Sequence, residues 1–186
     1  SDYARSLKAI RMKTRLSLII LLIVCFSCGT NNKPVSDPEK IVSYNDPSKD
    51  LNQVDLWQKF SGTWKGEIAK DTFIVYEERP YGTGMENKIS IITKGRVLQE
   101  GIGLFGYDRE SDKIIEATLL DGADIVCNAF WFISENTCEG IPFKNISNPE
   151  NSDLKWKIQF KSSDMWEVET LADGITVGTA ALYRVK

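Results

Sequence analysis

Apolar and polar residues alternate strictly in one stretch near the carboxyl end of the chain. In LKWKIQFK, residues 154–161, apolar side chains occupy every second position, and three lysines and a glutamine fill the positions between them. A repeat of two is the side-chain period of a β-strand, whose one face is then buried while the other meets water. The stretch therefore predicts a strand at the surface of a β-rich core.

Similar segments recur between residues 62 and 186, separated by turn signals such as Asp121-Gly122 and Asp173-Gly174. Nine or ten short strands with tight connections favour a mainly β fold, an antiparallel up-and-down β-barrel of about eight to ten strands, because closure removes exposed sheet edges. Besides LKWKIQFK, the expected strands are TWKGEIA, TFIVYEE, KISIITK, RVLQEGIGLFGY, KIIEATLL, DIVCNAFWFI, IPFKNI, MWEVETL and ITVGTAALYRV.

A short helix is expected immediately before these strands, over residues 51–60. We expect Ser48 or Asp50 to cap its start and Gly62 to end it. A period of 3.6 residues gathers its apolar side chains on one broad arc, which Gln53 interrupts. These apolar residues are Val54, Leu56, Trp57 and Phe60.

The amino-terminal part has the pattern of a targeting segment. MKTR, residues 12–15, is followed by eleven uncharged, mostly apolar residues, 16–26, a run shorter than the roughly 20 residues that span a bilayer. A basic start, a short apolar stretch and a small residue before a cleavage point are typical of a secretory signal peptide. The small residue is Ser27, and Cys28 follows it.

Cys28 in this setting resembles the lipobox cysteine of bacterial lipoproteins. The resemblance implies that its thiol receives a diacylglyceryl group, that it begins the mature chain, and that the protein is anchored in the bacterial cell envelope. Gly29 in the next position favours the outer membrane. The two cysteines of VCFSCG also have C-x-x-C spacing, but a redox motif needs a strand running into a helix, and a zinc site needs two further ligands.

These observations divide the chain into four parts. Residues 1–11 precede the candidate start at Met12 and are an upstream or cloning remnant; residues 12–27 form the signal peptide. Residues 28–50, rich in Pro, Ser, Asn, Asp and Lys, are a flexible tether. Residues 51–186 have the length of one domain.

Charge and composition exclude several functions. Five of the 23 basic residues and one of the 26 acidic residues precede Cys28, so the remainder carries a net charge of about −7 and should repel nucleic acid. The chain contains no histidine, which removes Ser-His-Asp and Cys-His catalysis, imidazole-bound zinc and haem held by a proximal histidine. We therefore expect a non-enzymatic protein with no catalytic residues, no metal site and no cofactor.

The remaining candidate groups have structural interpretations. Paired carboxylates at Glu77-Glu78, Asp121/Asp124 and Glu167/Glu169 are expected on the solvated surface. Glu77 and Glu78 are strand neighbours and face opposite sides, whereas Glu167 and Glu169 share one face, opposite that of Trp166 and Val168. Asp121 is expected in a turn with Gly122. Cys127 and Cys138 are either a disulfide or two separate buried thiols. A hairpin turn at residues 135–137 would place Cys138 opposite Ile133 and not opposite Cys127.

Two segments carry a family resemblance. FSGTWKGEI, residues 60–68, resembles the G-x-W strand of lipocalins and other calycins. GRVLQEGIGLFGYDRESDKI, residues 95–114, resembles a family of small bacterial β-barrel proteins of unassigned function, whose last strand ends near Tyr-Arg. The resemblance implies that Trp64 packs under Arg184 and that this pair closes one end of the barrel, a contact worth about 0.5 to 2 kcal/mol.

The leading functional hypothesis is a lipid-anchored barrel that binds or carries a small apolar or amphipathic ligand. The alternative is an envelope interaction or scaffold protein whose barrel is filled by side chains, and an enzyme would need Asp, Glu, Lys or Tyr side chains converging inside the barrel. Barrels of this size can enclose a cavity. The aromatic residues expected to line it are Phe73, Tyr76, Phe105, Trp131 and Phe132.

Overall fold

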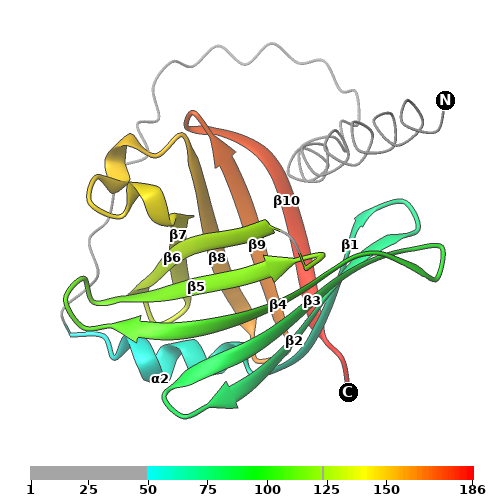
Figure 1. Cartoon of the computed structure of the whole chain (residues 1–186), viewed down its shortest axis with the longest axis horizontal. Helices are drawn as coiled ribbons and strands as arrows, with labels where there is room; N and C mark the ends of the chain where they lie inside the picture. Colours follow the sequence, from blue (N-terminus) through cyan, green and yellow to red (C-terminus); the bar gives the residue numbers. More distant parts are fainter. Residues whose placement is uncertain (1–49, 123) are drawn as a thin grey trace, which may run out of the picture.

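The computed structural model describes residues 50–122 and 124–186. Ten antiparallel strands in this part form one closed barrel, in which strands adjacent in sequence are also adjacent in space (Figure 1). The strands are β1 (Gly62–Ala69), β2 (Thr72–Tyr81), β3 (Gly84–Thr93), β4 (Arg96–Asp108), β5 (Lys113–Leu120), β6 (Asp124–Ser134), β7 (Thr137–Pro142), β8 (Leu154–Ser162), β9 (Met165–Ala172) and β10 (Ile175–Arg184).

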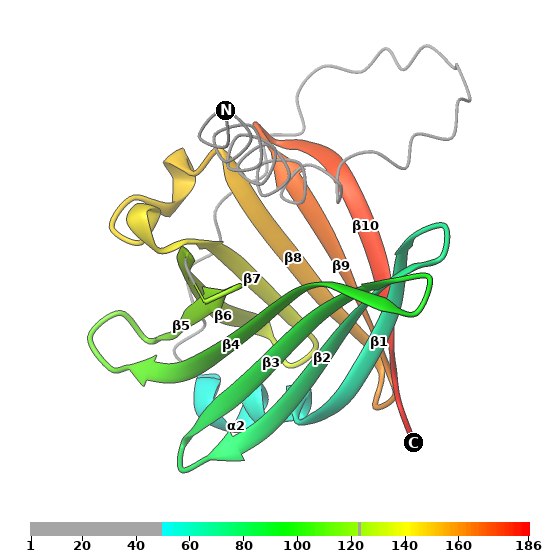
Figure 2. The ribbon, with the colours of Figure 1, turned by 45° about the vertical axis from the view of Figure 1, so that its right-hand side comes forward.

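The barrel closes between its first and last strands. Strand β1 pairs with β10 at Trp64↔Arg184 and Lys65↔Tyr183, and with β2 along most of its length. Tight turns join most neighbouring strands, and the connection between β7 and β8 is longer. At the β9–β10 turn both Asp173 and Gly174 have positive φ, which matches the twist of a hairpin. The strand order (Figure 2) confirms the predicted mainly β, up-and-down antiparallel barrel with one short helix before it.

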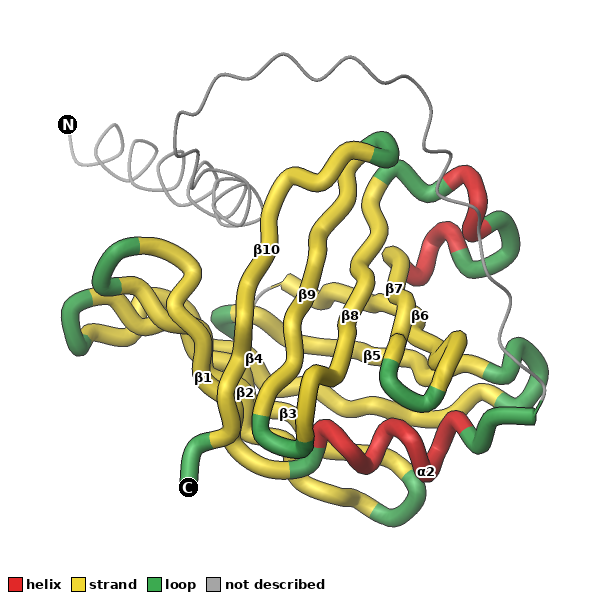
Figure 3. Tube along the Cα trace, turned by 180° about the vertical axis from the view of Figure 1, so that it is seen from behind, coloured by secondary structure: helices red, strands yellow, loops and turns green. Residues whose placement is uncertain are grey.

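Helix α2 (Gln53–Trp57) continues as the 3-10 turn η1 (Gln58–Phe60) across one end of the barrel (Figure 3). The side chain that caps the helix is that of Asn52, whose Oδ1 accepts a hydrogen bond from the Asp55 amide at 3.1 Å. The prediction of Ser48 or Asp50 as the cap is wrong, because Asn52 immediately precedes the first helical turn.

Gln53, which interrupts the apolar arc of the helix, attaches α2 to the barrel wall. Its side chain is buried, its Nε2 donates to the Phe132 carbonyl at 3.1 Å, and its Oε1 accepts from the Phe132 amide at 2.7 Å. The pairing of β6 with β7 shifts between Phe132 and Ser134. The glutamine amide therefore supplies backbone-like hydrogen bonds beside a β-bulge, where the ladder is interrupted.

The sequence pattern predicted a strand over the whole of IPFKNI, residues 141–146. This prediction is wrong, because only the first two of these residues belong to a strand. Strand β7 starts at Thr137 and pairs with β8 as far as Gly140, and Pro142, which has no amide hydrogen to donate, is its last residue. The chain then forms two 3-10 turns, η2 (Phe143–Asn145) and η3 (Pro149–Asn151), before β8.

Several predictions fall on residues that the structure does not describe. The remnant 1–11, the signal peptide 12–27, the lipidated Cys28 and the tether up to residue 49 all lie outside the described residues. Of the helices in the described part, none has the length and apolar character needed to span a membrane.

Candidate functional site

The end of the barrel that carries α2 is filled by aromatic side chains. The Trp57 ring lies 4.6 Å from the Phe60 ring, 5.0 Å from Phe105 and 5.4 Å from Phe130, measured between centroids. The buried Phe132 stacks on Phe160 in the same cluster. The helix thus closes this end with a core of packed aromatic rings and leaves the interior beyond it open.

Trp64 and Arg184 lie in contact at the seam between β1 and β10. The guanidinium carbon is 4.1 Å from the centroid of the indole, and the fully buried Trp64 donates through Nε1 to the Phe60 carbonyl at 2.6 Å. Arg184 Nε donates to the Ser163 carbonyl at 3.0 Å, and its two terminal nitrogens donate to the carbonyls of Lys59 and Ser61. This is the geometry that the calycin resemblance implied, and it places no polar group of the pair in the barrel interior.

On the side of the aromatic cluster that faces away from α2, the barrel contains a cavity of about 570 Å³. This volume lies in the usual range for small-molecule sites. Exposed Lys144 and Asp153, from the connection between β7 and β8, also line it, and Figure 2 shows this connection away from the end that α2 covers. Its aromatic lining consists of Trp57, Phe60, Tyr76, Phe105, Phe130, Trp156 and Trp166.

Glu116, on β5, is held in the cavity wall by two hydrogen bonds. Thr118 Oγ1 donates to Oε1 at 2.8 Å, and Asn128 Nδ2, from the opposite position on β6, donates to Oε2 at 2.7 Å. Burial raises the pKa of the Glu116 carboxyl, while the two hydrogen bonds act in the opposite direction. Gly103 on β4 leaves room for this arrangement, since a Cβ there would lie 2.2 Å from Thr118 Oγ1.

Glu78, on β2, is the second carboxyl group of the cavity. It is buried, and its Oε2 has no hydrogen-bond partner. Burial, and then the nearby charge of Glu116, raise the pKa of Glu78 to about 9, so the group is protonated at neutral pH. Burial also raises the pKa of Tyr76, with further contributions from Glu116 and Glu78. Two carboxyl groups and a phenol therefore share one low-dielectric space.

The buried polar atoms that lack a partner converge on this cavity. Within the described residues there are four such side-chain atoms: Trp57 Nε1, Glu78 Oε2, Asn87 Oδ1 and Trp166 Nε1. All four residues line the cavity. Buried polar groups are nearly always paired, because leaving one unpaired costs about 1 to 3 kcal/mol. The cavity thus presents two indole N–H donors and two oxygen atoms without a hydrogen-bond partner to whatever enters it.

Of the five aromatic residues predicted to line a cavity, Tyr76 and Phe105 do so. Phe132 lies instead in the aromatic cluster beside α2. Phe73 lies on the outer face, where Lys65 Nζ is 4.3 Å from its ring centroid, because β2 points Tyr76 inward and hence every odd-numbered neighbour outward.

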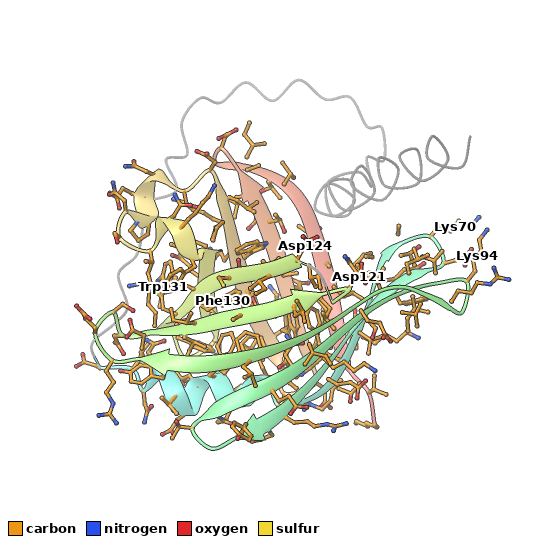
Figure 4. The ribbon with its side chains drawn as sticks, in the orientation of Figure 1. Lys70, Lys94, Asp121, Asp124, Phe130 and Trp131 are labelled. Carbon is orange, nitrogen blue, oxygen red and sulfur yellow. The ribbon has the colours of Figure 1, made fainter. Side chains whose placement is uncertain are left out.

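Trp131 also points away from the cavity. On β6 its neighbour Phe130 belongs to the inner face (Figure 4), so alternation turns Trp131 to the outer face. There it packs with Ala129, Ile141 and Ile146 in a small cluster outside the barrel. Its burial is therefore due to side chains on the outer face of the barrel, with Ile146 from the segment after β7 among them, and not to the barrel interior.

Sequence reasoning misses the polar residues that distinguish the cavity, which are Glu78, Asn87, Glu116 and Asn128. The expectation that Glu77 and Glu78 both lie on the solvated surface is wrong for Glu78. Glu77 does lie outside and pairs with Arg79 at 3.4 Å. The signal that could have found Glu78 is the alternation of side chains along the strand. Trp64 is paired with Tyr76 and both point inward, so Glu78, two residues after Tyr76, points inward as well.

Cys127 and Cys138 are both free thiols, one exposed and one buried. Cys138 lies opposite Phe132, not Ile133, because of the bulge in this hairpin. Phe132 is five residues from Cys127 along β6, a distance of about 16 Å. That exceeds the reach of a disulfide. Burial, and then Glu139, raise the pKa of the Cys138 thiol well above its ordinary value.

In the described part of the chain, no group of three or more His, Cys, Asp or Glu side chains is arranged to hold a metal ion. No protein-family model matches the chain, and no curated protein matches it. The description of the domain as a barrel compatible with the calycins therefore rests on strand order and register.

Proposed function

We propose that the domain formed by residues 51–186 binds and carries a small amphipathic molecule inside the barrel. The observation that carries this proposal is the cavity of about 570 Å³ into which four unpaired buried polar atoms converge. A side-chain-filled barrel, the basis of the interaction hypothesis, would need neither the space nor the unpaired atoms. An occupant with a matching polar group would satisfy them.

The ligand is amphipathic because the cavity wall is divided. Most of the lining is aromatic or aliphatic, which favours an apolar body. Glu78, Asn87 and Glu116 bring oxygen atoms to the same space, which favours a polar head that can donate hydrogen bonds.

The lipobox resemblance supports an envelope role for this carrier. Lipidation of Cys28 would attach the domain to a bacterial membrane, with the outer membrane favoured by Gly29, and residues 28–50 would let the barrel reach ligands near the surface. Replacement of Cys28 by serine should abolish acyl labelling, and persistent labelling would contradict the anchor.

A second candidate function is acid–base catalysis. The same cavity brings together Glu78, Glu116 and Tyr76, and a protonated buried carboxyl beside a second carboxyl group is the arrangement in which one serves as an acid. Mass spectrometry of a co-purified ligand after prolonged incubation with the protein distinguishes the two candidates. A carrier returns the ligand unchanged, whereas an enzyme converts it.

Binding is tested with Nile red, an uncharged apolar dye, and the full chain. Energy transfer from the cavity tryptophans reports dye inside the barrel. Val126 on β6 lines the cavity, whereas its neighbour Ile125 is exposed on the outer face. Val126→Phe should weaken binding by about tenfold or more, because the larger ring occupies ligand space. Ile125→Phe should leave binding unchanged; equal effects of the two variants, or no saturable binding, would contradict the proposal.

A further inference from the structure

The cavity has an excess of acidic groups over basic ones. Glu78 and Glu116 enter it from β2 and β5; Glu78 is buried and Glu116 is half-buried. Among the residues that line the cavity, the one basic residue is Lys144, and its side chain is exposed. The acidic Asp153 is another exposed residue of the lining. The inner carboxyl groups therefore lack a buried cation among the lining residues, although buried carboxylates ordinarily need one.

Two oxygen atoms without a hydrogen-bond partner stand side by side in this cavity. Glu78 on β2 is directly opposite Asn87 on β3, and Glu78 Oε2 and Asn87 Oδ1 both lack a donor. Side chains in such a position have Cβ atoms about 4.5 to 5.5 Å apart, so one donor group can reach both oxygens. An ammonium group carries three N–H donors and no acceptor, which suits this pair.

Aromatic rings surround the same space. Tyr76 lies beside Trp166 with ring centroids 6.0 Å apart, and Phe130 lies beside Trp156 with centroids 6.1 Å apart. The face of an aromatic ring attracts a cation, and it also packs well against the apolar body of a ligand. Carboxylates and rings in one cavity favour an organic cation over a neutral or anionic molecule of the same size.

We propose that the polar head of the ligand is a protonated amine that binds between Glu78, Asn87 and Glu116, with an alkyl or arylalkyl body against the aromatic wall. This inference rests on the proposed binding function and adds the chemical class of the ligand. The indole N–H groups of Trp57 and Trp166 are then left to donate to an oxygen on the ligand body.

An ammonium group favours the ionised form of a neighbouring carboxyl group, so its binding beside Glu78 is coupled to loss of the Glu78 proton. Glu78, whose pKa is about 9 in the structure, releases its proton to solvent when the cation arrives. Affinity for the amine should therefore rise with pH up to about pH 9. The titratable groups that share the cavity with Glu78 are Tyr76, Glu116, Cys127, Lys144 and Asp153.

The test compares three probes of similar shape with the full chain: 2-phenylethylamine, 2-phenylethanol and 3-phenylpropionate. Each is titrated calorimetrically, and each is competed against Nile red. The amine should bind about tenfold or more tightly than the alcohol, and the acid should bind most weakly. Buffers of different ionisation enthalpy should change the observed enthalpy for the amine and not for the alcohol.

Matched variants locate the effect. Glu78→Gln and Glu116→Gln should each lower affinity for the amine about tenfold while affinity for Nile red is retained, which shows that the barrel is folded. Glu77→Gln, one residue away and on the outer face, should change neither.

The outcomes separate the two proposals. If the alcohol binds as well as the amine, or if Nile red binds and none of the three probes does, the amine inference is overturned and the binding function stands. If neither Nile red nor any probe binds, the binding function itself is overturned.

Discussion

Glu78 and Asn87 face each other across β2 and β3, and each presents an oxygen without a donor to the same cavity. Such a pair opposes folding in the absence of an occupant, because each of the two oxygens loses water and gains no hydrogen bond. A second inward asparagine, Asn128, differs because it donates to Glu116 at 2.7 Å. Asn87 should therefore lower the stability of the empty barrel, whereas Asn128 should raise it.

Asn87→Leu should raise the free energy of unfolding by about 1 kcal/mol, since it removes an unpaired buried acceptor. Asn128→Leu should lower it by about 1 to 3 kcal/mol, since it leaves Glu116 with one donor fewer. Urea unfolding of the full chain measures both. Destabilisation by both variants to the same extent would contradict the assignment of Asn87 Oδ1 as unpaired.

Stability should fall as the pH rises from about 4.5 to about 9. The pKa of Glu78 is raised from its ordinary 4.5 to about 9 in the folded protein, so the folded state binds the additional proton throughout this window. The contribution is complete below the lower value and is lost as the pH passes the higher one, with a slope of at most about 1.4 kcal/mol per pH unit. The raised pKa of Glu116 acts in the same direction.

Glu78→Gln should remove much of this slope and become more stable than the wild type at alkaline pH. Urea unfolding near the two ends of the window measures the change, with Glu77→Gln as the control. The same slope in wild type and Glu78→Gln would show that Glu78 is not protonated inside the barrel.

Gln53 should be essential for the attachment of α2. Gln53→Leu removes both hydrogen bonds to Phe132 and leaves a buried backbone amide and carbonyl unpaired, so the free energy of unfolding should fall by about 2 to 4 kcal/mol. Gln58→Leu, at a half-buried position in η1, should change it by less than about 0.5 kcal/mol. Similar losses for the two variants would indicate that the helix itself, and not the Phe132 contact, is being disturbed.

The two cysteines of the barrel should react with maleimide at very different rates without any reductant. Cys127 is exposed and should be labelled within the mixing time of an ordinary experiment, whereas Cys138 is buried with a raised pKa and should react only after unfolding. Peptide mapping distinguishes the sites. A disulfide-linked peptide pair containing both residues would contradict the register of β6 and β7.

The fold could be predicted because its signals are local. The alternation in LKWKIQFK and the turn at Asp173-Gly174 identify β8 and the β9–β10 hairpin without knowledge of any distant residue. The pattern failed at IPFKNI, since the same apolar residues that suggest a strand there cover the outer face of β6. In the sequence Gln53 looks like a polar interruption of the apolar helix face. Its hydrogen-bond partner, the Phe132 backbone, is 79 residues away and cannot be recognised from the local pattern.

The cavity could be predicted only in part. Strand β2 carries apolar residues on both faces, with Phe73 and Val75 outside and Ile74 and Tyr76 inside, so its pattern does not show which face is inner. The inward direction of Trp64, transferred to its partner Tyr76 and then by alternation along β2, would have placed Glu78 inside the barrel. Its proximity to Glu116 depends on the register of three intervening strand pairs, which no single segment determines.

The central claim is that a small molecule occupies the barrel interior, and native mass spectrometry of the full chain isolated from its own host tests it most directly. We predict a reproducible additional mass on the wild-type chain that is retained by Ile125→Phe and lost from Val126→Phe. A wild-type chain that carries no small molecule, or an additional mass that Val126→Phe retains in full, would contradict the account.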